Sequence, residues 1–169
     1  MHMTIRAIVY AENKNNAVSQ AEGVFTRLVE RDTLDYYSLF GEGAEDIWGD
    51  RSVASKYKTK EGKKLVKDGW DFTYRDTKEY FKKVKKILKK YKNVDDFLDG
   101  DTFDRWYLYK LGAYEGSSLW LYDDDGSGIR DEKHLNNVLD KWKHLYEDKN
   151  INNPYKNKDI WVVPADVHF

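Results

Sequence analysis

The chain has 169 residues, of which 40% are hydrophobic and 15% aromatic, with 29 basic and 30 acidic residues and no cysteine. This length fits one domain with a hydrophobic core, and the near-zero net charge excludes a general attraction to nucleic acid or to an acidic membrane. The lack of cysteine excludes disulfides and thiolate metal sites. Because the sequence shows no signal peptide and no stretch of about 20 apolar residues, we expect a cytoplasmic protein that does not enter membranes.

The first part of the chain predicts a strand, a helix and a second strand. Residues 5–10 are rich in β-branched residues, which is typical of a strand. Residues 13–16 supply turn and cap chemistry, and from residue 17 to residue 29 apolar side chains recur at helical spacing. Residues 35–40 predict the second strand. A glycine-rich, acidic loop at residues 41–49 follows.

The middle of the chain predicts mainly helix. Residues 51–71 are basic and weakly periodic, and they predict no defined element. Residues 78–92 form the clearest helix in the sequence, with apolar side chains at helical spacing among many lysines. Asp101 or Thr102 is expected to cap a following aromatic helix that ends near Gly116.

The last part of the chain predicts a second arrangement of strand, helix and strand. Residues 119–122 are expected to form a strand, and Asp131 is expected to cap the helix that follows. Residues 160–163 predict the final strand. We expect that strand to end near Pro164, because proline cannot donate a backbone hydrogen bond to a neighbouring strand.

Together these elements predict a single α+β domain over residues 1–169. Because both ends of the chain predict β-α-β, the sequence favours a ferredoxin-like split β-α-β core, an antiparallel sheet with helices on one face. Residues 50–116 would form a mainly helical insertion between the two halves. An α/β sandwich with a differently ordered sheet is the alternative. Residues 5–10 and 162–168 also loosely resemble segments of archaeal or viral proteins, a resemblance that implies no function.

The loop after the third predicted strand has the most specific local pattern. Asp123, Asp125 and Ser127, followed by Gly128, resemble the first half of a calcium-binding loop, in which oxygen ligands alternate before a sharp turn. The second half departs from this pattern, because His134 stands where an EF-hand needs a bidentate glutamate. Asp123, Asp125 and Ser127 are therefore candidate metal ligands, although a polar loop with glycines at its turn explains the same residues.

The lysine-rich helix is a candidate nucleic-acid-binding element. Four of its lysines could follow a phosphate backbone, and nearby tyrosines could stack on bases. These lysines are Lys82, Lys85, Lys86 and Lys89. The helix lacks arginine and is flanked by acidic residues, so a solvated outer face explains the pattern equally well.

The aromatic helix is a candidate interaction surface. Trp106, Tyr107 and Tyr114 belong to residue types that are enriched at protein interfaces, although such a stripe also forms ordinary core. With 13 Tyr and 6 Trp in the chain, a monomer is not expected to bury all of its aromatic surface, which favours a homodimer. No cofactor is predicted, since the sequence contains neither a P-loop nor a GxGxxG motif.

Three functions follow from these patterns, and they leave open whether the protein is an enzyme. The first is a non-enzymatic interaction or regulatory domain that self-associates, and it is favoured because it requires no chemistry beyond what the sequence shows. The second is a nucleic-acid-binding module that uses the lysine-rich helix. The third is a small hydrolase that depends on a divalent metal ion held by Asp123 and Asp125.

Overall fold

The computed structural model describes residues 2–39, 53–112, 120–147, 149, 152–153 and 156–168. Its strands are β1 (His2–Ala11), β2 (Tyr36–Leu39), β3 (Ser55–Lys56), β4 (Leu121–Tyr122) and β5 (Asp159–His168). Its helices are α1 (Lys14–Glu30), α2 (Lys60–Lys90), α3 (Val94–Leu98), α4 (Thr102–Gly112) and α5 (Glu132–Glu147). Within the described residues the protein is therefore of the mixed α+β class that the sequence predicts. The predicted acidic loop at residues 41–49 lies outside the described residues.

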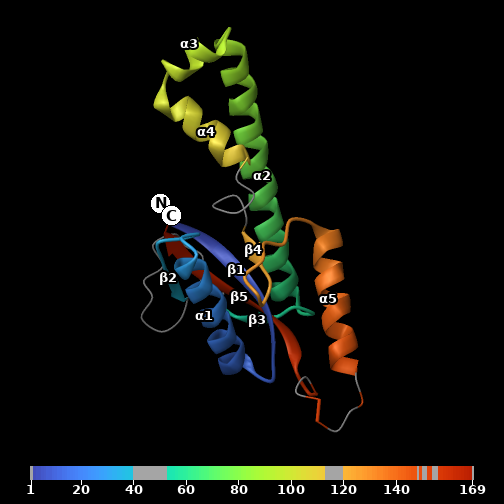
Figure 1. Ribbon diagram of the computed structural model, residues 1–169. Coiled ribbons are helices and arrows are strands. Elements are labelled where there is room, and N and C mark those ends of the chain that lie inside the picture. The colour runs from blue at the N-terminus through green and yellow to red at the C-terminus, as the bar shows by residue number, and fades with distance from the viewer. Residues whose placement is uncertain are drawn as a thin grey trace.

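The centre of the sheet is formed by the first and last strands of the chain. β1 and β5 pair antiparallel over ten residues, from His2 opposite His168 to Ala11 opposite Asp159. β4 pairs parallel to β1 on one side, while β2 and β3 both pair antiparallel with β5 on the other. The N- and C-termini consequently lie together at one end of the sheet (Figure 1).

The ferredoxin-like order of the strands is not confirmed. The strand order is β2-β5-β1-β4. A split β-α-β core needs two β-α-β units whose strands run parallel, yet β4 runs parallel to β1 while β5 runs antiparallel to it. The segment from β4 through α5 to β5 therefore joins two antiparallel strands.

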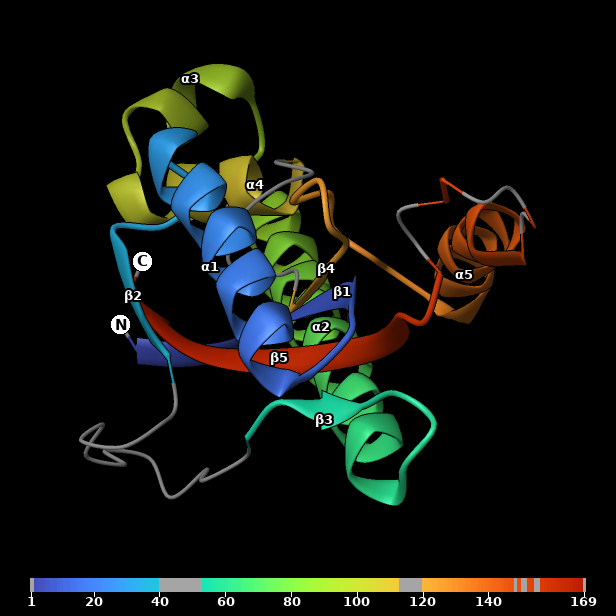
Figure 2. The same ribbon diagram turned by 90° about the horizontal axis from the view of Figure 1, so that it is seen from below.

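Helices cover both faces of the sheet, so the prediction that they lie on one face is wrong. Successive side chains of a strand point to opposite faces. Ile5 and Val9 of β1 pack in one buried cluster with the α1 side chains Val24 and Phe25. Ile8 of the same strand packs in a second cluster with side chains of α2 and α5. Figure 2 shows α1 lying over β5, with α5 at the end of the sheet away from the chain termini.

β5 continues through Pro164 to His168, beyond the end that the sequence predicts. Pro164 lies opposite Arg6, whose backbone N–H donates to the carbonyl of Trp120 at 2.9 Å on the β4 side. The pair of Arg6 and Pro164 is therefore one of the antiparallel pairs that exchange no hydrogen bonds, and proline is tolerated there. On the other side of β5, β2 pairs with residues 165–168 and β3 with residues 161–162, so no described strand pairs with Pro164 there.

The lysine-rich helix is the second half of a helix of 31 residues. α2 begins at Lys60, where the Thr59 side chain accepts a hydrogen bond from the Gly62 amide at 3.1 Å. Its first half packs on the sheet through Leu65, Val66, Gly69 and Thr73. Because a glycine and a threonine occupy this buried face, the apolar repeat is weak, and the sequence did not reveal the helix before residue 78.

Beyond the sheet, α2 continues as a projecting element that carries α3 and α4 at its far end (Figure 1). We call residues 74–112 the arm. No helix in the described part of the chain combines the length and the apolar character required to cross a membrane.

Candidate functional site

The arm is held together by the contact between α2 and α4. Val84 and Ile87 are the buried α2 side chains in this region. The Tyr80 ring lies 5.8 Å from the ring of Tyr107 and 6.2 Å from that of Trp106, centre to centre. The Lys83 ammonium donates to the Tyr107 hydroxyl at 3.0 Å. The inner face of the arm is thus used for its own packing, and the remaining faces of α2 and α4 are available to partners.

The end of the arm is fixed by a polar contact around Asp104. Its carboxylate accepts hydrogen bonds from the Tyr91 hydroxyl at 2.6 Å and from the Lys90 ammonium at 2.8 Å. These two hydrogen bonds, that of Lys90 first, hold the pKa of Asp104 below its usual value, and the same contact raises the pKa of Lys90. The turn between α2 and α4 is therefore tied back to the end of α2.

The four lysines predicted to bind nucleic acid all lie on exposed positions of the arm. None of Lys82, Lys85, Lys86 and Lys89 takes part in an ion pair among the described residues. In the first half of α2, by contrast, Lys64 and Lys67 pair with acids one turn further along the helix. Between residues 75 and 92 the chain has nine basic and two acidic residues. The second half of α2 is therefore a strongly cationic surface, which we call the lysine face.

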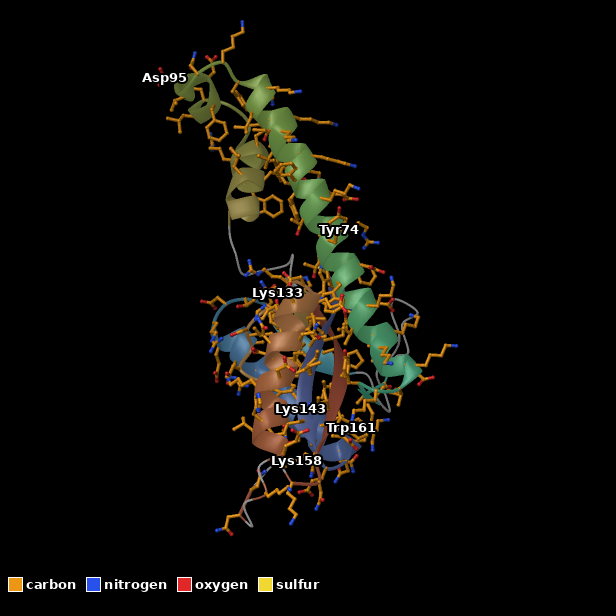
Figure 3. The ribbon with its side chains drawn as sticks, turned by 90° about the vertical axis from the view of Figure 1, so that its right-hand side faces the viewer. Tyr74, Asp95, Lys133, Lys143, Lys158 and Trp161 are labelled. Carbon is orange, nitrogen blue, oxygen red and sulfur yellow. The ribbon has the colours of Figure 1, made fainter. Side chains whose placement is uncertain are left out.

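Apolar side chains accompany the lysine face. Tyr74, Phe81 and Leu88 follow one another at intervals of seven residues, which places them along one side of the helix. Their exposed fractions are 71%, 49% and 65%. The Lys85 ammonium lies 4.6 Å from the centre of the Phe81 ring, a cation–π contact. Figure 3 labels Tyr74 at the point where this row begins.

The far end of the arm carries a second apolar surface. Val94, Leu98, Phe103 and Trp106 are 70%, 58%, 71% and 42% exposed. Exposed carboxylates surround them, at Asp95, Asp96, Asp99 and Asp101. We call these eight residues the tip; Asp95 marks it in Figure 3. The tip is apolar and anionic, whereas the lysine face is cationic.

The three residues predicted as an interaction surface have different environments. Trp106 belongs to the tip and is partly exposed. Tyr107 turns toward α2, where it packs against Tyr80 and accepts the hydrogen bond of Lys83. Tyr114 lies outside the described residues. Of the two that the structure describes, Trp106 is the one on an exposed surface.

The tip includes residues that the sequence analysis missed. α3 was not predicted because its five residues are too few to show a periodic apolar pattern. A local signal was present, since the Asn93 side chain caps α3 by accepting a hydrogen bond from the Asp96 amide at 2.8 Å. An asparagine followed by two acids in the first turn is typical of a helix start.

The aspartate loop is organised by its own backbone. The Asp123 carboxylate accepts hydrogen bonds from the amides of Asp125 at 3.0 Å and Ser127 at 2.8 Å. Gly126 takes a φ of 80°, which the turn requires. Burial, followed by the charges of Asp125 and Asp123, raises the pKa of the neighbouring Asp124 carboxyl.

Metal binding by Asp123, Asp125 and Ser127 stays a prediction. Among the described residues, no three or more His, Asp or Glu side chains are grouped as a metal ion would require. The hydrogen bonds to Asp123 show that one proposed ligand already has a role in the turn. A calorimetric titration with calcium and magnesium tests the prediction directly, since a flat titration would contradict it.

The whole chain matches a known protein family. Residues 1–169 match the family described as "Domain of unknown function (DUF7995)", and the chain belongs to this family. No curated protein and no solved structure matches the chain. The match does not test the resemblance to archaeal or viral proteins, which also stays a prediction.

Proposed function

We propose that this family member is a non-enzymatic interaction domain that forms a homodimer through the tip of its arm. One observation carries the proposal. Ten large hydrophobic side chains are strongly exposed among the described residues, and seven of them lie on the arm. These seven are Tyr74, Phe81, Leu88, Val94, Leu98, Phe103 and Trp106. Because exposed apolar clusters on a soluble protein mark contact sites, the arm is the element that a partner would cover.

The tip suits a second copy of the same chain. Its two largest apolar side chains are aromatic, and aromatic residues are enriched at protein interfaces. Phe103 is 71% exposed, so burying it against a partner removes apolar surface from water at no cost to the packing inside the arm. A two-fold dimer places the same patch of both chains in contact, so each exposed tip residue is used twice.

The carboxylates of the tip predict how such a dimer responds to salt. In a two-fold contact between tips, Asp95, Asp96 and Asp99 of one chain approach the same acids of the other. Like charges repel, and at about 0.15 M salt the repulsion is screened beyond roughly 8 Å. Dimerisation through the tip should therefore strengthen as the salt concentration rises.

Sedimentation velocity over a range of protein concentrations tests the homodimer. We expect a concentration-dependent dimer in the wild-type protein and a monomer in the double variant Leu98→Ser, Phe103→Ser. Val53→Ser serves as the matched control, because Val53 is 45% exposed but lies off the arm. A wild-type protein that stays monomeric at every concentration and salt condition would contradict the proposal, as would a dimer that persists in the double variant.

A second candidate function is nucleic-acid binding by the lysine face. The specific observation is that exposed aromatic rings stand among lysines that have no ion-pair partner in the described part of the chain. Single-stranded nucleic acid is bound by this combination, in which ammonium groups follow the phosphates and aromatic rings stack on bases. The lysine face thus resembles a non-specific single-strand site.

Fluorescence anisotropy with a labelled oligothymidine tests this candidate. For four phosphate contacts, the logarithm of the affinity should fall against the logarithm of the salt concentration with a slope of about −3. The change of Lys82, Lys85, Lys86 and Lys89 to Glu should abolish binding. The control variant reverses the charge of four exposed lysines that lie off the arm, Lys14, Lys60, Lys133 and Lys141. Binding that does not change with the salt concentration, or that is lost equally in both variants, would exclude the lysine face as the nucleic-acid-binding site.

Salt separates the two candidate functions. Contact between acidic tips should strengthen with added salt, whereas contact between the lysine face and phosphates should weaken. The same salt series, applied to sedimentation and to anisotropy, therefore assigns each surface independently.

A further inference from the structure

A pocket of about 380 Å³ opens at the end of the sheet opposite the chain termini, between α5 and the β3–β5 edge. Its volume lies within the range of roughly 300–1,000 Å³ that is usual for small-molecule sites. It shares no residue with the arm, so it is independent of the function proposed above. In Figure 3, the labels Lys143 on α5 and Lys158 just before β5 mark this region.

The floor of the pocket is aromatic. Tyr10 comes from the end of β1 and Trp142 from the inner face of α5, and their rings meet edge to face with centres 5.3 Å apart. Tyr57 adds a third ring from the segment after β3, where its backbone N–H donates to the carbonyl of Ile160 at 2.8 Å. Leu139, Leu145 and Ile160 add aliphatic side chains to the lining. Such a floor favours a flat aromatic ligand, which gains area burial and ring contacts together.

The rim of the pocket is charged, with an excess of cations. Four lysines and three carboxylates line it. Two of the carboxylates already face lysines, since Asp159 pairs with Lys56 at 2.6 Å and Glu147 lies 3.8 Å from Lys143. Lys58 takes part in no ion pair among the described residues, and the Lys158 ammonium lies 5.4 Å from the centre of the Tyr10 ring. A cation is thus placed directly beside the aromatic floor.

We propose that this pocket binds a planar aromatic molecule that carries one acidic group, with its ring on Tyr10 and Trp142 and its anion at Lys58 and Lys158. The single excess positive charge of the rim matches one negative charge on the ligand. An aromatic carboxylate matches this charge, and a nucleoside monophosphate, whose phosphate carries nearly two negative charges at pH 7, also combines a flat ring with an anion. Their common features, a flat ring and an anion at its edge, are what the pocket recognises.

Isothermal titration of the full chain with three probes tests the proposal. The probes are indole-3-acetate, adenosine 5′-monophosphate and adenosine, which keeps the ring but lacks the anion. We expect saturable binding of at least one anionic probe and at least tenfold weaker binding of the neutral one. The anionic probe that binds identifies the class of acidic group. If neither anionic probe binds at millimolar concentration, or if adenosine binds as well as its monophosphate, the proposal is overturned.

Variants locate the binding within the pocket. Lys58→Gln with Lys158→Gln should weaken the anionic probe at least tenfold, because both cations of the proposed anion site are removed. Leu145→Trp should block it, since Leu145 lines the pocket and is 40% exposed, so a larger side chain fits without disturbing the core. Lys133→Gln with Lys141→Gln is the matched control on α5, outside the lining. Equal affinity in all these variants would place the probe elsewhere and overturn the assignment.

Discussion

Gly62 stands where the first turn of α2 passes very close to the backbone of β3. A Cβ atom at this position would lie 2.1 Å from the carbonyl oxygen of Lys56, a backbone atom that cannot turn aside. We therefore expect Gly62→Ala to lower the free energy of unfolding by about 1–3 kcal/mol, the usual cost of forced overpacking. Urea denaturation followed by circular dichroism measures this change.

Gly23 provides the control for this substitution. It lies inside α1, and a Cβ atom there would meet only the end of the Arg27 side chain, at 3.6 Å. Gly23→Ala should stabilise the protein by about 0.5–1 kcal/mol, because alanine loses less backbone entropy in a helix. If both variants shift stability in the same direction, the close approach at Gly62 is not the controlling factor.

The stability that Asp104 contributes should depend on pH. The hydrogen bonds from Lys90 and Tyr91 lower its pKa in the folded protein. The stability that these contacts give is therefore present above the unfolded pKa of about 3.9, and it is lost as the pH falls through the lower folded value. In Lys90→Met, NMR titration of the carboxyl carbon should show the pKa of Asp104 rising toward its usual range.

The matched variant is Lys89→Met, which removes a neighbouring lysine from the outer side of the same helix. The pKa of Asp104 should be unchanged in this variant, because Lys89 forms no ion pair in the described part of the chain. A pKa that rises equally in both variants would mean that the general positive charge of the arm, and not the hydrogen bond of Lys90, is responsible.

For single residues, the sequence predicts local hydrogen bonds such as helix caps well, and contacts between residues distant in the sequence poorly. Asp131 was expected to cap a helix, and its carboxylate does accept a hydrogen bond from the His134 amide at 2.8 Å. The contact of Tyr91 and Lys90 with Asp104 could not be predicted. It joins residues 13 and 14 positions apart across a turn that contains α3, so its geometry depends on the tertiary structure.

Among the elements, α5 begins with a hydrogen bond to a single side chain, that of Asp131. Removing the hydrogen bond that Asp131 accepts leaves a backbone donor of the first turn without its partner. Asp131→Ala should therefore lower the free energy of unfolding by about 1 kcal/mol. Asp131→Asn should cost much less, since asparagine caps a helix about as well as aspartate. Chemical denaturation of the two variants checks this, and equal losses would contradict the capping role.

The elements that the sequence predicted incompletely share a physical reason. The first half of α2 packs on the sheet through side chains that include Gly69 and Thr73, so its buried face does not look apolar. β5 extends past Pro164 because its neighbours there do not need a hydrogen bond from that residue. In both cases contacts with neighbouring elements decide the structure, and a local sequence pattern does not reveal those contacts.

For the whole molecule, the sequence indicated that the first and last strands belong to one sheet, and they pair over ten residues. The strand order could not be derived, because β4 has only two residues, too few for an alternating pattern that would indicate its place in the sheet. The sequence also could not predict which apolar side chains are exposed to solvent. Trp106 could have been a core residue at helical spacing, and only the position of α4 at the end of the arm shows that it is partly exposed.

The contrast between sheet and arm leads to a prediction about local stability. In β1 and β5 the side chains of Ile5, Val9, Val162 and Val167 are completely buried. In the arm, Val84 and Ile87 are the buried α2 side chains, and they retain exposed fractions of 7% and 5%. Few buried contacts allow a region to open without global unfolding. Amides of residues 74–112 should therefore exchange with deuterium faster than those of β1 and β5.

Hydrogen exchange measured at several protein concentrations tests whether the tip forms a dimer. If the tip joins two chains, the dimer must hold the arm in its folded form, because binding stabilises the state that it recognises. Exchange in residues 94–106 should then slow as the concentration rises, and amides of β1 and β5 that exchange by global unfolding should slow as well. Leu98→Ser with Phe103→Ser should remove this concentration dependence. Arm amides that exchange at the same rate at every concentration would show that the tip stays exposed to solvent.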